Sequence, residues 1–105
     1  MTKKALILAT LAVALPAAQA LAADEMALAQ KSACTACHAV DKKVVGPAFK
    51  DVAAKYKGNA KAQAMLEEKV KKGGVGVWGQ VPMPPNASVK DEDVKTLVKW
   101  VLSLK

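Results

Sequence analysis

The residues with the clearest potential for chemistry in this chain are two cysteines and a histidine in the segment Cys34-Thr35-Ala36-Cys37-His38. The pattern C-x-x-C-H attaches c-type haem: both thiols form thioethers with the porphyrin vinyl groups, and the histidine binds the iron. Two residues between the cysteines match the distance between the vinyl groups, and the next residue turns beneath the ring. Because the chain has one histidine and two cysteines, the motif predicts a single haem c.

Two other uses of such a cysteine pair have to be weighed. A haem-free thiol–disulfide protein of the thioredoxin kind would place the pair at a strand–helix junction, and this sequence shows no strand pattern. Half of a zinc site would need two more ligands, and no other Cys or His is present to supply them. Haem attachment through Cys34 and Cys37, with His38 on the iron, is therefore the favoured interpretation.

The ligand on the other side of the iron separates an electron carrier from a reactive haem. An open position would make a five-coordinate gas sensor or peroxidase, whereas a methionine thioether stabilises ferrous iron and raises the reduction potential. Met26 and Met65 lie in stretches with a helical pattern, where methionine usually fills gaps in the core. Met83 lies in Val81-Pro82-Met83-Pro84-Pro85, where prolines exclude a helix and stiffen the backbone. We predict that Met83 binds the iron opposite His38.

Residues 1–22 have the three-part pattern of a secretory signal peptide. Two lysines precede an apolar run from Ala5 to Leu15, and small residues follow it. The run is too short for a membrane span, which needs about 20 residues, so a retained membrane anchor is disfavoured. We predict export to the periplasm with cleavage after Ala22, and cuts after Ala20 or Ala23 are the alternatives.

The remaining domain, residues 23–105, would have 83 residues and a net charge of +5, since two of the 16 lysines leave with the signal peptide. A core of that size is marginal without a disulfide network, a metal or a cofactor. Aromatic residues make up only 4% of the chain, which suggests that something other than side chains fills the centre. Every basic residue is lysine, and the absence of arginine disfavours nucleic acid as a partner.

Apolar periodicity predicts an all-α domain with about four helices. Pro47 suits the first turn of a helix, and Gly58 and the pair Gly73-Gly74 are natural helix ends. Ser88 and Asp91 resemble a capping box before the last helix. The predicted helical segments are 24–33, the stretch from Gly46-Pro47 to Gly58, 60–72, and the stretch after Ser88, with an irregular glycine- and proline-rich loop over 73–87.

The chain resembles the class I c-type cytochromes, and within them the small bacterial cytochrome c-551 (cytochrome c8) type. The resemblance covers essentially all of residues 23–105. Its specific parts are the Cys34–His38 motif, Val44-Val45-Gly46-Pro47, Gly76-Val77-Trp78-Gly79, Val81-Pro82-Met83-Pro84-Pro85-Asn86, and a C-terminal helix that carries Trp100. The predicted ligands His38 and Met83 are 45 residues apart, which matches the short version of the fold.

This resemblance implies a small cytochrome c fold wrapped around one covalently bound haem, with crossing terminal helices and one exposed haem edge. It implies a periplasmic monomer that carries single electrons, transforms no substrate and does not insert stably into a membrane. The usual donors in this family are cytochrome bc complexes, and the acceptors include nitrite reductases, terminal oxidases and peroxidases. A positive surface would steer the protein to acidic patches on such redox partners, and its residues include Lys31, Lys42, Lys43, Lys71 and Lys72.

The resemblance also implies roles for residues around the two iron ligands. The carbonyl of Pro47 would accept the N–H of His38, which fixes the tautomer and makes the imidazole a better donor. Asn86 would brace the loop that carries Met83, or bond its sulfur, and an ordinary turn residue is the alternative for this position.

Two further residues are implied as partners of the haem propionates. The indole N–H of Trp78 would donate to one propionate, unless Trp78 is an ordinary core residue. Lys69 stands where relatives often have an arginine, and a lysine can pair with the same group but not bidentately. Tyr56 would pack against the haem in a structural role.

Overall fold

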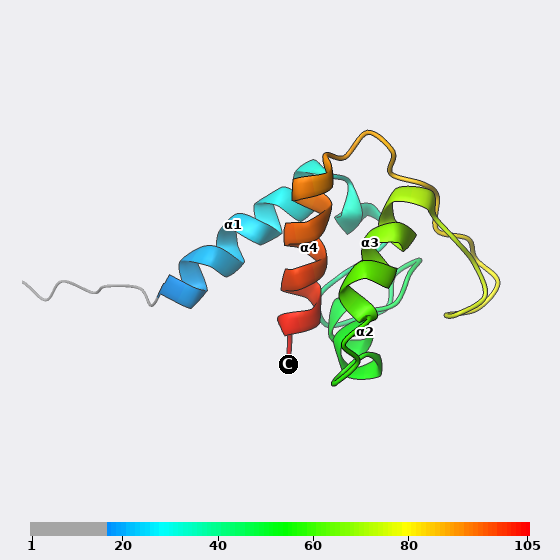
Figure 1. Cartoon of the computed structure of the whole chain (residues 1–105), viewed down its shortest axis with the longest axis horizontal. Helices are drawn as coiled ribbons and strands as arrows, with labels where there is room; N and C mark the ends of the chain where they lie inside the picture. Colours follow the sequence, from blue (N-terminus) through cyan, green and yellow to red (C-terminus); the bar gives the residue numbers. More distant parts are fainter. Residues whose placement is uncertain (1–16) are drawn as a thin grey trace, which may run out of the picture.

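Four α-helices and a short 3-10 turn form the regular structure of residues 17–105, the part of the chain that the computed structural model describes (Figure 1). In chain order they are α1 Ala17–Lys31, the 3-10 turn η1 Cys34–Ala36, α2 Phe49–Lys55, α3 Ala62–Lys72 and α4 Asp91–Ser103. The prediction of an all-α fold with about four helices is confirmed. The apolar run of the predicted signal peptide, Ala5 to Leu15, lies outside the described residues.

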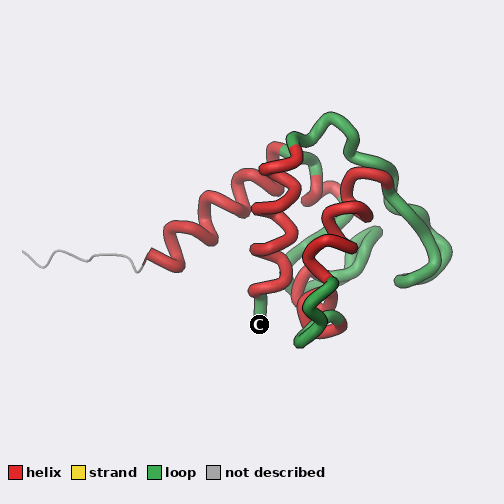
Figure 2. The backbone as a smooth tube through the Cα atoms, viewed as in Figure 1, coloured by secondary structure: helices red, strands yellow, loops and turns green. Residues whose placement is uncertain are grey.

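Helix α4 is the element on which the other helices pack, since it contacts α1, α2 and α3. Its apolar positions repeat with helical spacing, and the buried ones are Val94, Leu97, Val98 and Trp100. Burying one large apolar side chain contributes about 1.5–3 kcal/mol, so this face of α4 supplies a large share of the core. Figure 2 shows α1 on one side of α4, with α2 and α3 on the other.

The first helix differs from its prediction at both ends. It begins at Ala17 rather than near Asp24, because the alanine-rich stretch before Asp24 contains no glycine or proline and alanine is the best helix former. It ends at Lys31 rather than Ala33. Ala33 has a φ of 63°, in the left-handed region, and this residue turns the chain into η1.

The second helix is shorter than predicted. It begins at Phe49 rather than Pro47, because Ala48 is extended with a ψ of 141°. It ends at Lys55, and Gly58, with a φ of 77°, belongs to the turn that follows. The short helix leaves the carbonyl of Pro47 outside any helical hydrogen-bond ladder, where it is available to a side chain.

The long loop over 73–90 is held against the end of α3 by backbone hydrogen bonds. The Gly74 N–H donates to the Met83 carbonyl at 3.0 Å, and the Met83 N–H donates to the Gly74 carbonyl at 2.8 Å. The Asn86 N–H donates to the carbonyl of Val70 in α3 at 3.0 Å. The loop therefore leaves α3 and returns to it, which fixes the position of Met83.

The start of the last helix corrects one prediction. Ser88 does not cap it, because the N-cap residue is Lys90, and Lys90 makes no side-chain capping bond. Three acidic residues in the first turn stabilise this end through the helix dipole instead. Within residues 17–105, no helix has the length and apolar character that crossing a membrane requires.

Candidate haem site

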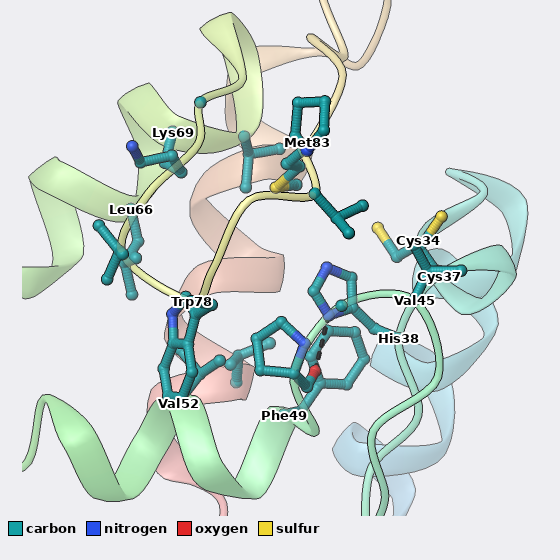
Figure 3. A pocket seen from close by; sticks show the side chains of 18 of the residues that line it. Cys34, Cys37, His38, Val45, Phe49, Val52, Leu66, Lys69, Trp78 and Met83 are labelled. Carbon is teal, nitrogen blue, oxygen red and sulfur yellow. Dashed lines mark hydrogen bonds between the residues drawn. The ribbon is translucent and has the colours of Figure 1, made fainter.

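A large apolar cleft lies between the turn at Cys34–His38 and the loop that carries Met83 (Figure 3). It encloses about 1190 Å³ of space between protein atoms, its open mouth included. Helices α2, α3 and α4 contribute to its walls together with the connecting loops, and representative lining residues are Val45, Val52, Leu66, Val70 and Leu97. The cleft brings Cys34, Cys37, His38 and Met83 together around one space.

The turn that carries the cysteines presents three side chains to this cleft. The N–H groups of Cys37 and His38 both donate to the carbonyl of Cys34, at 3.2 Å and 3.0 Å. These bonds close η1 so that Cys34, Cys37 and His38 line the cleft, while Thr35 and Ala36 are exposed. The C-x-x-C-H spacing thus places two thiols and one imidazole at the same wall.

The imidazole of His38 is held in one tautomer. Its Nδ1 lies 2.8 Å from the carbonyl oxygen of Pro47. Because a carbonyl oxygen can only accept, Nδ1 carries the proton and Nε2 keeps a free lone pair, as metal binding requires. The ring also stacks on Phe49, with centroids 5.1 Å apart and an interplanar angle of 19°.

The backbone of Gly46 forms a cradle for this imidazole. A Cβ at Gly46 would lie 2.5 Å from Cε1 and 2.9 Å from Nδ1 of His38, so a side chain there is excluded by the ring. The Gly46 N–H donates to the carbonyl of Cys37 at 2.7 Å, which ties this segment to the cysteine turn. The imidazole is fixed by a hydrogen bond, a stacked ring and a glycine.

The Met83 side chain enters the cleft from the opposite wall. Figure 3 shows Met83 and His38 on two sides of the open space. Met83 is half-buried, whereas the prolines beside it in the loop are exposed. The amide nitrogen of Asn86 donates to the carbonyls of Val70 at 3.2 Å and Pro84 at 3.3 Å, so this side chain braces the loop through main-chain oxygens.

Trp78 and Lys69 lie on the side of the cleft remote from the cysteines (Figure 3). Trp78 is 43% exposed and lines the cleft. Lys69 is half-buried, and a side chain at Gly74 would collide with its amine end. Among the described residues that line the cleft, Lys69 is the one lysine, and Tyr56 lines the same region.

The thiol of Cys34 is half-buried in the wall of the cleft. Burial raises the pKa of Cys34, which disfavours the thiolate. Reactive cysteine pairs depend instead on a lowered thiol pKa. The direction of this shift does not favour the thioredoxin-like alternative.

Several residues of the site carry no recognisable signal in the sequence. Phe49 stacks on His38, and Gly73 lies against the backbone of the Met83 loop. Lys71 donates to the carbonyl of Val89 at 2.6 Å and pairs with Asp91 at 2.9 Å, which pins the far end of that loop. The sequence offers two indirect signals for these residues: the pair Gly46-Pro47 shortly before Phe49 and the pair Gly73-Gly74 after α3.

The donor set fits a c-type haem. A neutral imidazole nitrogen and a thioether sulfur enter one apolar cleft from opposite walls, with two thiols at its side. His and Met are the axial ligands of electron-carrying c-type haems, and two thiols are the attachment points of the porphyrin. Two segments far apart in the chain, the turn at Cys34–His38 and the loop at Met83, thus agree on one group.

Comparison with known proteins gives the same family. The Cytochrome c family model matches residues 22–105. Cytochrome c-551 of Allochromatium vinosum is 62% identical over 80 residues, covering 76% of this chain and 85% of that protein. Cytochrome c-551 of Pseudomonas aeruginosa is 56% identical over 86 residues, covering 82% of each. The crystal structure of cytochrome c552 from Nitrosomonas europaea superposes with a TM-score of 0.74 at 55% identity, covering 76% of this chain and 99% of that one.

The similarity extends over the part of the chain that builds the cleft and includes both cysteines of the attachment motif. A single C-x-x-C-H motif attaches a single haem c, through Cys34 and Cys37. From the fold, the cleft and these relatives together, the chain belongs to the cytochrome c family, as a class I monohaem electron carrier of the c-551/c-552 type rather than an enzyme.

Proposed function

We propose that this protein carries single electrons between respiratory redox proteins in the periplasm, with its iron held between His38 and Met83. The observation that supports this most is the convergence of these two side chains on one apolar cleft from opposite walls. Bound haem supplies one-electron exchange between ferric and ferrous iron. A methionine thioether favours the ferrous state, so Met83 raises the reduction potential.

The chain keeps both ligands in place whichever oxidation state is present. His38 is fixed by Pro47 and Phe49, and the Met83 backbone is fixed by its paired hydrogen bonds to Gly74. The Pro47 carbonyl also makes the imidazole a better electron donor. Apolar walls exclude water, so little has to reorganise when an electron arrives or leaves.

Two cleft residues are suited to the acidic propionate groups of a haem. Lys69 is a half-buried cation in an otherwise apolar wall, and a charge in such a place is stabilised by an anion beside it. Trp78 places an indole N–H donor at the same end of the cleft. We assign both as propionate partners, with Asn86 as the brace of the Met83 loop.

The mouth of the cleft has the character of a transient docking surface. Its exposed apolar lining residues are Val45, Val75, Val77, Trp78 and Val81. Lys42 and Lys43 lie shortly before Val45 in the chain and are exposed. An apolar patch beside lysines suits brief contact with acidic redox proteins. We propose a cytochrome bc complex as donor and a nitrite reductase, terminal oxidase or peroxidase as acceptor.

An absorption spectrum of the purified protein tests the ligand assignment. We expect c-type bands, a weak far-red methionine–iron band when oxidised, and no change in the reduced spectrum under carbon monoxide. A reduced spectrum that shifts under carbon monoxide, without the far-red band, would show an open iron and favour the gas-binding or peroxidase alternative.

Ionic strength tests the docking surface. The rate of electron transfer to an acidic redox protein should fall as salt rises, because the screening length shortens to about 10 Å at 0.1 M. Lys42→Gln with Lys43→Gln should lower this rate at low salt. The control is Lys95→Gln with Lys99→Gln, an equal charge change on the exposed face of α4. Equal losses in both pairs would contradict a localised docking surface.

The mass of the protein recovered from the periplasm tests the signal peptide. We expect a chain that starts at Ala23, because cleavage after Ala22 removes residues 1–22. Asp24 and Glu25 would then lie in the first turn of a shortened α1, where negative charge is favourable. A membrane-bound protein of full mass would overturn the proposal in favour of a retained anchor.

A further inference from the structure

Trp78 lies on the least supported part of the Met83 loop. Between Gly76 and Gly79, the Gly76 N–H donates to the Gly79 carbonyl at 2.9 Å. Both glycines have positive φ, at 103° and 117°, and a Cβ on either would meet open space. The indole is 43% exposed. The backbone on each side of Trp78 therefore has conformational freedom that a packed segment would lack.

One side chain from a helix reaches this indole. The Nζ of Lys55 lies 5.5 Å from the centroid of the Trp78 ring and 5.9 Å from that of Tyr56. Both distances are within the range of about 6 Å over which an ammonium is attracted to the face of an aromatic ring. Lys55 is the last residue of α2, where a positive charge is also favoured by the helix dipole.

This contact connects helix α2, which is packed into the core, to the loop that carries Trp78. Helix α2 is anchored by Phe49, Val52 and Ala53, all of which are buried. Tyr56, at the end of α2, lines the cleft together with Trp78. An ammonium shared between the two rings therefore restrains the indole relative to the wall of the cleft.

We propose that Lys55 is a positioning residue for Trp78, and that its charge over the indole face holds the indole N–H toward the cleft. The role rests on the proposed function, because the indole N–H matters to electron transfer only if it meets a haem propionate. An exposed cation–π contact is worth about 0.5–1 kcal/mol, so losing it releases the indole rather than unfolding the protein.

The test is the solvent exchange rate of the Trp78 indole N–H, followed by NMR in the reduced holoprotein. Lys55→Met keeps the length of the side chain and removes its charge, and we expect exchange about two- to five-fold faster. Lys55→Arg keeps a cation over the ring and should restore the native rate. The indole N–H of Trp100, which is 5% exposed, is an internal reference that should not change.

Lys57→Met is the matched control, since it removes one exposed lysine charge two residues further along the chain. Equal exchange rates in Lys55→Met and Lys57→Met would overturn the proposal, as would an equal effect of Lys55→Arg and Lys55→Met. Failure of the proposed function would be detected by two other measurements, the reduction potential and carbon monoxide binding. If Trp78 meets no propionate, Trp78→Phe leaves the reduction potential unchanged, and if Met83 is not a ligand, the reduced native protein binds carbon monoxide.

Discussion

Replacing Met83 by alanine is expected to open one side of the iron while leaving the haem attached. The thioethers at Cys34 and Cys37 and the ligand His38 are untouched by this change. Without the thioether the ferrous state loses its stabilisation, so the reduction potential should fall by about 0.1 V or more, within the roughly 0.8 V range that axial ligands cover. The far-red band should disappear, and the reduced protein should bind carbon monoxide.

Met65→Ala is the control for this substitution. Met65 lies on α3, is 41% exposed and does not line the cleft. We expect its far-red band, potential and carbon monoxide response to match those of the native protein. A Met83→Ala protein that kept the far-red band and excluded carbon monoxide would show that another group binds the iron.

Gly73→Ala is expected to damage the same ligand indirectly. Gly73 has a φ of 74°, and a Cβ there would collide with the backbone of Met83, Pro84 and Pro85. With a ψ of −173° this backbone lies in a region nearly restricted to glycine, which costs about 1–3 kcal/mol for alanine, and overpacking adds about 1–3 kcal/mol. Because the colliding atoms are main chain, the loop has to move. We expect a lower free energy of unfolding in denaturant and a weakened far-red band.

Gly58→Ala separates the cost of the glycine backbone conformation from the cost of the collision, the two causes of the lower stability expected for Gly73→Ala. Gly58 has nearly the same φ, 77°, but a Cβ there meets nothing within 4 Å. Chemical denaturation should show only the backbone cost of about 1–2 kcal/mol, with the far-red band intact. If both variants lost the same stability and kept the same spectrum, the contact between Gly73 and the Met83 loop would have no role in holding the ligand.

The helices were predictable where an apolar stripe or a glycine defines them. On α4, Val94, Leu97 and Val98 follow helical spacing and are buried, and Gly73 directly follows the last residue of α3. The start of α4 was not predictable, because Val89 N–H bonds Asn86 and Lys71 takes the Val89 carbonyl, which leaves Ser88 in a separate turn. The Lys71 contact joins residues 18 apart in the chain and leaves no periodic pattern in the sequence.

The candidate site, too, was predictable from the sequence only in part. Cys34, Cys37 and His38 form a local motif whose spacing follows directly from the porphyrin, and Met83 stands out because prolines surround it. The stacking of Phe49 on His38 depends instead on how α2 meets the cysteine turn. Neither the residue types nor their spacing predict how these two elements pack, so the stacking is visible only in the structure.

Two backbone hydrogen bonds help to fasten the loop that carries Met83, and they constrain how this loop can change in evolution. Its fastening bonds run between the main-chain groups of Gly74 and Met83. The large side chains beside them, Val75, Val77 and Val81, are 57%, 49% and 64% exposed and take no part in those bonds. Because these side chains also line the cleft, a substitution there would change the surface offered to a partner and the wall of the haem pocket together, while the bonds that hold the Met83 backbone stay in place.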